Sequence, residues 1–417
     1  MQLVVEPQSG RVDTVPRVLV GGVRGPVRLV VATTDAAGHR WESSGTYVVG
    51  ADGALVFDDA ERPWWDMAFA NADAVPVAFT APDTELRYEV RVSADGAPPG
   101  TAVTDVRRCW GPGKGAEDVR GDGFVLRIYR PNGRPGEAPG VVVVPGSTGV
   151  SAMAPTAALL AAHGYVAAVL GYMQEPGLPS TFRQIPIEAI LAGLRGFAAL
   201  PGVDPARVGV LGVSVGTVAA LAALSGSDAP PIGGVVVASP THVVWQAQAE
   251  GAPPKASMLT RDGRDLPYVR IRAEKLLGQI LRTQLARRFS RRPRSAALEL
   301  LPAFRAGPSA ANAVGDAAIP VERIAAPMLA VAGEADAMWP SAAMAQALLD
   351  RRKERGDTSH DRLLLLPDAG HFLRAPVTPT TVDRNESLVS GGTPEGTARG
   401  QRTAWDTMLG FFTETIR

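Results

Sequence analysis

In roughly the first hundred residues, apolar and polar positions alternate along the chain. The segment 85–92 places an apolar side chain at every second position, which is typical of a strand with one buried face. Further strands are expected at 27–31 and 45–49, and turn-forming sequences occupy 35–38 and 51–53. This spacing predicts an all-β domain, an immunoglobulin-like sandwich of about seven strands.

From about residue 116 the pattern changes to short, continuously apolar runs separated by stretches of helical periodicity. The runs at 140–144, 207–211 and 327–333 are expected to be buried strands. Helices are expected at 153–163 and 187–200. Alternating strands and helices predict a mostly parallel sheet with helices on both faces.

A Gly- and Pro-rich stretch at 111–115 separates the two patterns and is expected to be a linker. We therefore expect a β-domain over residues 1–112 and an α/β domain over residues 113–417. An insertion at about 240–320 interrupts the alternation of strands and helices, and its centre at 273–289 has apolar residues at helical spacing.

The pentapeptide Gly212-Val213-Ser214-Val215-Gly216 lies between the apolar run 207–211 and an expected helix at 217–224. A G-x-S-x-G sequence at a strand-to-helix turn is the nucleophile elbow of the α/β-hydrolase fold. The turn is sharp, so the residues beside the serine must lack a bulky Cβ, and the hydroxyl faces the positive end of the following helix. We therefore predict an α/β-hydrolase fold with Ser214 as the nucleophile.

The partners of the serine are expected in the chain order of this fold, an acid and then a histidine. His371 follows the apolar run 363–366 in a Gly-His loop, where the base is expected. Asp336 lies in the turn after the run 327–333 and is the predicted acid. Glu334 in the same turn is its competitor, but a residue one step beyond the strand end usually points elsewhere.

The apolar run 140–144 leads into a turn that contains Gly146, Ser147 and Thr148. In α/β-hydrolases one oxyanion donor is the backbone N–H after the nucleophile, here that of Val215. The other comes from the loop after the third strand, here from Ser147 or Thr148. The glycine lets the backbone approach a substrate carbonyl. A phosphate-binding loop is not expected, because the turn has no Gly-Lys-Ser/Thr and no G-x-G-x-x-G sequence.

The composition removes several other classes of function. Lys plus Arg and Asp plus Glu both number 42, so nothing indicates a nucleic-acid partner. No Cys/His cluster has metal-ligand spacing, and no metal or cofactor is expected. The single cysteine, Cys109, excludes an intramolecular disulfide. The segment 1–7 has neither a basic region nor a long apolar run, so we expect no signal peptide, no membrane span and a cytoplasmic protein.

In α/β-hydrolases an insertion at this place commonly covers the active site as a cap. Arg287 and Arg288 lie in its central segment, and one hypothesis is a lid whose arginines meet the phosphates of a nucleotide-bearing substrate. The alternative hypothesis is a solvated helix face. His242 follows the apolar run 235–237 and is a further candidate for the wall of the site.

With these segments in place, the chain resembles the family of acyl-CoA thioesterases and bile acid-CoA:amino acid N-acyltransferases over nearly its whole length. The string from Asp336 through Trp339 to Ser341 is more specific than the elbow alone. The similar segments are 3–7, 41–47, 159–165, 212–216, 239–245, 318–322, 333–341, 369–371 and 391–394. The resemblance implies a triad of Ser214, Asp336 and His371. The substrate contacts expected with it are Gly146, His242, Trp339, Arg287 and Arg288.

Members of that family that transfer the acyl group to amino acids carry cysteine at the position of Ser214. The resemblance therefore implies hydrolysis of an acyl-CoA or carrier-bound acyl thioester, with water as the acceptor. An acyltransferase or cyclising chain-release enzyme, a carboxylesterase or lactone hydrolase, and a non-catalytic binding protein on a hydrolase scaffold are the alternatives. The sequence says nothing of acyl chain length or oligomeric state.

Overall fold

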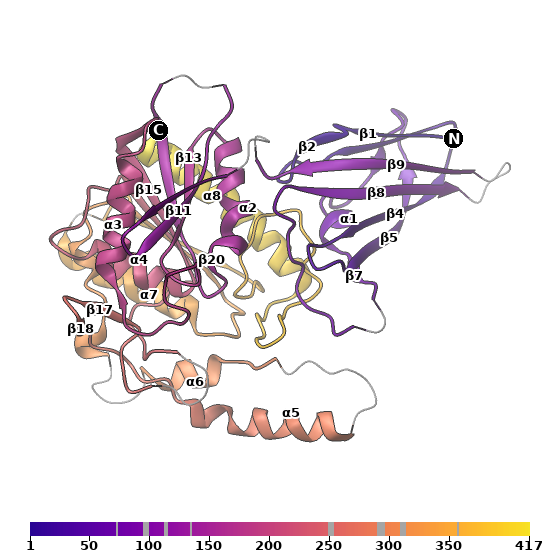
Figure 1. Cartoon of the computed structure of the whole chain (residues 1–417). Coiled ribbons are helices and arrows are strands. Elements are labelled where there is room, and N and C mark those ends of the chain that lie inside the picture. Colours follow the sequence, from indigo (N-terminus) through magenta and orange to yellow (C-terminus); the bar gives the residue numbers. More distant parts are fainter. Residues whose placement is uncertain are drawn as a thin grey trace.

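The protein is described by a computed structural model. The described residues are 1–71, 74–94, 100–111, 116–133, 136–248, 254–289, 297–308, 314–356 and 358–417, without the side chains of 283, 286, 287 and 289. Two parts lie beside each other, an N-terminal part built of strands and a larger part in which helices flank a central sheet (Figure 1). Most of the expected linker, residues 112–115, lies outside the described residues.

The N-terminal part contains two unequal sheets. The larger has the order β2-β9-β8-β4-β5-β6 with β7 paired to β5, and β1 and β3 form the smaller one. In β8 every second side chain is buried, which is the consequence of the alternating pattern at 85–92. The predicted all-β domain is confirmed. Its elements are β1 (Gln2–Glu6), β2 (Ser9–Arg11), β3 (Arg17–Gly21), β4 (Pro26–Thr34), β5 (Arg40–Val49), β6 (Leu55–Val56), α1 (Arg62–Trp65), β7 (Ala68–Phe69), β8 (Glu85–Ala94) and β9 (Gly100–Cys109).

The larger part is built on an eight-stranded sheet of order β10-β11-β13-β12-β15-β16-β19-β20. Every neighbouring pair from β13 to β20 is parallel, and only the pairs β10-β11 and β11-β13 are antiparallel. The central strands are buried on both faces, as their continuously apolar sequences require. The strands are β10 (Glu117–Gly121), β11 (Phe124–Tyr129), β12 (Ala138–Val144), β13 (Val166–Gly171), β15 (Val203–Val213), β16 (Gly234–Ala238), β19 (Met328–Gly333) and β20 (Arg362–Leu366).

Helices cover both faces of this sheet, and the α/β-hydrolase fold class predicted from the sequence is confirmed. The helices α3 (Ile187–Ala198), α4 (Val215–Leu224) and α7 (Ser341–Arg352) pack against one face. The helices α2 (Gly149–Ala162) and α8 (Pro394–Ile416) pack against the other. Gly164, at a φ of 93°, follows the end of α2, as expected of a glycine after a helix.

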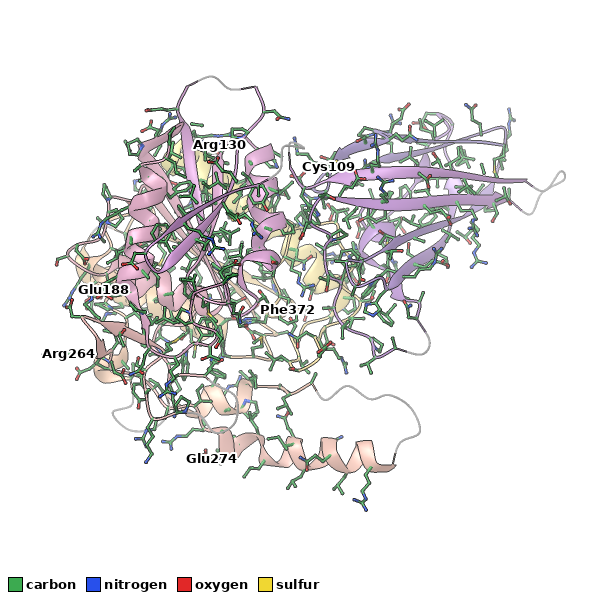
Figure 2. All side chains as sticks on the ribbon, in the orientation of Figure 1. Cys109, Arg130, Glu188, Arg264, Glu274 and Phe372 are labelled. Carbon is green, nitrogen blue, oxygen red and sulfur yellow. The ribbon has the colours of Figure 1, made fainter. Side chains whose placement is uncertain are left out.

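The N-terminal part docks on the face that α2 and α8 cover, and its core is continuous with theirs. Asp13 lies at this junction, where its carboxylate is 2.5 Å from His163 Nε2 and accepts the indole N–H of Trp405 at 3.2 Å. Arg402 of α8 also pairs with Glu61 at 2.7 Å. Cys109 ends β9 next to the same junction (Figure 2). The two parts are therefore joined by apolar packing and by buried polar contacts.

The insertion between β16 and β19 forms short elements at one side of the molecule (Figure 1). Its strands β17 (Leu259–Arg261) and β18 (Arg264–Asp265) form a small sheet with β14 (Ile185–Pro186). Its helices are α5 (Leu277–Phe289) and α6 (Leu301–Ala306), and the 3-10 turns of the domain are Ala273–Leu276, Gly315–Ala317, Val321–Arg323 and Lys353–Arg355. Along α5, Leu277, Leu281 and Leu285 are exposed. Among the described residues, no helix combines the length and apolarity needed to cross a membrane.

Candidate active site

Ser214 occupies a strained turn between β15 and α4. Its φ of 55° and ψ of −129° lie outside the regions that residues with side chains usually adopt. Space requires glycine at Gly216, because a Cβ there would lie 2.3 Å from the carbonyl oxygen of Val144. The backbone N–H of Ser214 donates to Ala238 O at 2.9 Å and ties the elbow to β16. These contacts hold the hydroxyl at the carboxyl edge of the sheet.

The structure brings Ser214, His371 and Asp336 into one hydrogen-bonded line. His371 Nε2 is 2.9 Å from Ser214 Oγ, and His371 Nδ1 is 2.7 Å from Asp336 Oδ2. The other carboxylate oxygen of Asp336 accepts the backbone N–H groups of Met338 at 2.7 Å and Trp339 at 3.2 Å. With the Nδ1–H tautomer that this arrangement favours, Nε2 is free to accept the serine proton. Glu334, the competing acid, is exposed to solvent.

Trp339 and Ser239 contact His371 and hold it in place. The Trp339 ring packs edge-on against the imidazole of His371 with ring centres 4.7 Å apart, and its side chain is 1% exposed. Ser239, directly after β16, donates its hydroxyl to His371 O at 2.9 Å, and its backbone carbonyl oxygen accepts the Trp339 indole N–H at 3.3 Å. Trp339 thus contacts the base rather than an open surface. The sequence prediction missed Ser239, whose signal was its place at a strand end beside the elbow strand.

The predicted oxyanion turn lies against the elbow. β12 and β15 are neighbours with Val144 opposite Gly212, so the turns that follow them meet at the same edge of the sheet. A Cβ on Gly146 would lie 3.0 Å from the Cβ of Ser214, so the backbone at Gly146 closely approaches Ser214. Ser147 and Thr148 are exposed and precede α2, while Val215 begins α4. The roles of these N–H groups as oxyanion donors stay predictions.

The remaining predicted substrate contacts, His242, Arg287 and Arg288, lie in the insertion. His242 is half-buried, and burial lowers the pKa of its imidazole. Its Nδ1 has no hydrogen-bond partner among the described residues. Arg288 is exposed on α5, and the side chain of Arg287 lies outside the described residues. Among the described residues, no hydrogen bond, ion pair or ring contact joins His242 or Arg288 to Ser214, His371 or Asp336, so the roles predicted for these residues stay predictions.

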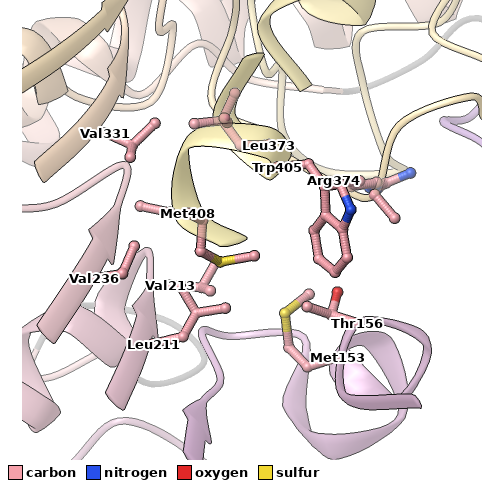
Figure 3. A pocket seen from close by; sticks show the side chains of 13 residues that line it. Met153, Thr156, Leu211, Val213, Val236, Val331, Leu373, Arg374, Trp405 and Met408 are labelled. Carbon is pink, nitrogen blue, oxygen red and sulfur yellow. The ribbon is translucent and has the colours of Figure 1, made fainter. Parts of the chain in front are cut away.

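A small apolar cavity lies beneath the face of the sheet that α2 and α8 cover (Figure 3). Val213, one residue before Ser214, and Leu373, two residues after His371, both line it. Its other lining residues are Met153, Thr156, Leu211, Val236, Ala238, Val331, Arg374, Ala375, Ala404, Trp405 and Met408. Arg374 is the charged member of this set, and burial lowers the pKa of its guanidinium to about 10. The guanidinium lies 5.0 Å from the ring centre of Phe372.

Comparison with known proteins decides the family. A family model described as BAAT/acyl-CoA thioester hydrolase C terminal matches residues 194–417, which include Ser214, Asp336 and His371. The chain belongs to this family of acyl-CoA thioester hydrolases. The family assignment made from the sequence is thus confirmed, and the chain is a hydrolase of the acyl-CoA thioesterase family.

Curated members of the family resemble the chain over most of its length. Human acyl-coenzyme A thioesterase 1 is 25% identical, and the match covers 98% of this chain and 96% of that protein. Mouse peroxisomal succinyl-coenzyme A thioesterase is 23% identical, with 86% and 78% covered. Among solved structures, a dienelactone hydrolase-like promiscuous phosphotriesterase from metagenomic libraries is 17% identical with a TM-score of 0.44, and the match covers 72% of this chain and 98% of that one.

Proposed function

We propose that this member of the acyl-CoA thioester hydrolase family hydrolyses acyl-CoA thioesters through an acyl-Ser214 intermediate. The observation that carries the proposal is the continuous line from Ser214 Oγ through the His371 imidazole to Asp336, with separations of 2.9 Å and 2.7 Å. A serine, a general base and a carboxylate in this arrangement activate a hydroxyl for attack on an acyl carbonyl.

In the acylation step, Ser214 Oγ attacks the thioester carbonyl carbon and His371 Nε2 takes the serine proton. The charge that develops on the carbonyl oxygen is stabilised by the N–H group of Val215 and by that of Ser147 or Thr148. The carbon–sulfur bond breaks, and the imidazolium returns its proton to the leaving thiolate. The products of this step are a free thiol and an ester on Ser214.

In the deacylation step, water replaces the thiol. His371 Nε2 removes a proton from the water as it attacks the ester, and the imidazolium then protonates Ser214 Oγ. Asp336 stabilises the imidazolium in both steps and keeps the ring in place. The net reaction consumes one water and releases a carboxylic acid and a thiol.

The family and its curated members support coenzyme A as the thiol. The alternative is that the thiol belongs to an acyl carrier protein. Coenzyme A and a carrier protein both present phosphate, so a phosphate contact would serve either one. Arg288 is exposed on α5, and we propose that it contacts a phosphate group of the substrate. We also propose that the protein acts in the cytoplasm.

The test compares wild type and Ser214→Ala on acyl-CoA thioesters of increasing chain length. Free thiol, product mass and intact-protein mass are followed together. We expect thiol release, a free acid that carries the oxygen of water, and an acyl adduct in wild type only, with turnover of the variant lowered at least about 10³-fold. Ser225→Ala, which replaces another serine at the far end of α4, is the control and should keep its turnover. An amide or lactone product would instead assign the acyl group to an amine or hydroxyl acceptor.

A further inference from the structure

A buried tyrosine holds the start of the predicted oxyanion turn. Tyr172 directly follows β13 and is 1% exposed. Its hydroxyl donates to the carbonyl oxygen of Pro145 at 2.8 Å. Pro145 is the first residue after β12 and precedes Gly146 and Ser147 in the turn. A side chain at the end of the neighbouring strand thus fixes the first carbonyl group of this turn.

The nucleophile elbow also confines the same carbonyl group. A Cβ on Gly216 would lie only 2.5 Å from Pro145 O, so the first turn of α4 packs directly on it. The hydrogen bond from Tyr172 and the close packing of Gly216 together set how far the oxyanion turn stands from the elbow. Burial raises the pKa of the Tyr172 hydroxyl well above its ordinary value of 10, so the hydroxyl keeps the proton that it donates.

We propose that Tyr172 is a positioning residue for the oxyanion hole. Through Pro145 O it fixes the N–H groups of Ser147 and Thr148 relative to that of Val215, which lies next to Gly216. This inference rests on the proposed function, acyl transfer through Ser214. Oxyanion donors act only when they are held in place before charge develops on the substrate oxygen. Freedom in the turn therefore weakens binding of the transition state more than binding of the substrate.

The chain offers a matched control at the other end of the same strand. Tyr165 directly precedes β13 and is also 1% exposed. In the described part of the chain its buried hydroxyl has no hydrogen-bond partner. Tyr165→Phe and Tyr172→Phe therefore remove the same group from equally buried rings, but only Tyr172→Phe breaks a bond to the oxyanion turn.

The experiment measures kcat and KM of both variants with p-nitrophenyl acetate and with an acyl-CoA thioester. It also measures the inhibition constant of an alkyl boronic acid, whose adduct with a serine mimics the tetrahedral intermediate. For Tyr172→Phe we expect kcat to fall about tenfold, less than the 10²–10³ measured elsewhere for loss of a whole donor. KM should stay within about twofold of wild type, and boronate binding should weaken about as much as kcat falls. Tyr165→Phe should match wild type in all three.

Two results would overturn the inference. The first is a Tyr172→Phe variant that loses no more kcat than Tyr165→Phe. The second is a loss of kcat without any change in the boronate inhibition constant, which does not depend on the fraction of enzyme that is folded. Measurements with p-nitrophenyl acetate distinguish failure of the inference about Tyr172 from failure of the proposed function. Wild type that hydrolyses the ester but no thioester would contradict thioester hydrolysis and still test Tyr172.

Discussion

Asp336 accepts three hydrogen bonds, one from the His371 ring and two from the backbone N–H groups of Met338 and Trp339. All three partners are donors, so the residue at this position must be an acceptor on both of its side-chain oxygens. A side-chain amide has only one acceptor oxygen and would turn an N–H group towards a donor. The requirement for a carboxylate is therefore set by the surrounding donors.

At the residue scale we predict that Asp336→Asn keeps the fold and lowers kcat by about 10³–10⁴, as loss of the orienting carboxylate does in other serine enzymes. The amide holds the wrong tautomer of His371, so Nε2 no longer accepts the serine proton. Steady-state kinetics and circular dichroism of the purified variant provide the measurement. Glu334→Gln, an exposed change in the same turn, should leave kcat within about twofold. Equal losses in both variants would contradict this assignment of the acid.

At the scale of elements, glycine positions show where the strands and helices meet without room for a side chain. Gly216, in the first turn of α4, would place a Cβ against two carbonyl oxygens of the β12 end. Gly410, an exposed position in the interior of α8, would place a Cβ in open space. Two glycines in helices therefore have opposite expected effects on substitution by alanine.

We predict that Gly216→Ala destabilises the protein by at least about 3 kcal/mol, because the backbone must move apart. Its kcat/KM should fall at least about 10²-fold through displacement of the oxyanion turn. Gly410→Ala should raise the free energy of unfolding by about 1 kcal/mol, because alanine favours the helix, and should leave kcat unchanged. Urea unfolding and kinetics of both variants test this pair. A Gly216→Ala enzyme of full stability and activity would contradict the close approach of α4 and β12.

At the scale of the whole molecule, Asp13 joins the N-terminal part to α2 and α8. Burial alone would raise the pKa of its carboxyl group, but the hydrogen bonds and charges of His163 and Arg11 outweigh burial and lower the pKa from 3.8 to about 2. A carboxyl group whose pKa is lowered by folding stabilises the protein above its unfolded pKa. That contribution is lost as the pH falls from about 4 towards 2, and its full size is about 2 kcal/mol.

We therefore predict that Asp13→Asn lowers the free energy of unfolding at pH 7 by about 2 kcal/mol. The difference from wild type should narrow as the pH falls below 4, because the wild-type carboxyl group then becomes neutral as well. Urea unfolding at several pH values measures this difference. Asp52→Asn, at an ion pair with Arg17 in which both side chains are 63% exposed, is the control and should change stability far less. A constant difference between pH 7 and pH 3 would contradict the linkage.

The sequence predicted the elements and the order of the site because those features depend on local signals. Alternating positions give half-buried strands, and continuous apolar runs give strands buried on both faces, as seen in β8 and β12. The residues at the ends of parallel strands then meet at one edge, so Ser214, Asp336 and His371 could be grouped before their distances were known.

The position of Ser239 at the end of β16 indicates that it lies near the elbow, but the hydrogen bonds of Ser239 and Tyr172 could not be predicted, because each joins residues that are far apart in the chain. The Ser239 hydroxyl reaches a carbonyl group 132 positions away, and nothing near it in the chain indicates that partner. The exposed leucines of α5 show another limit of pattern reading. Helical spacing predicts an apolar face, but whether another element covers that face depends on the packing of the whole molecule.

The backbone shape of the elbow also limits how the chemistry of this enzyme can evolve. A residue at a φ of 55° tolerates an unbranched side chain far better than a β-branched one. Threonine would carry the same hydroxyl but adds a methyl group at the Cβ, so the elbow selects against it even though it is a nucleophile in other enzymes. Cysteine has no such branch. An ancestral gene with this turn can therefore exchange oxygen for sulfur at position 214 without remodelling the fold, whereas an exchange for threonine requires a different turn.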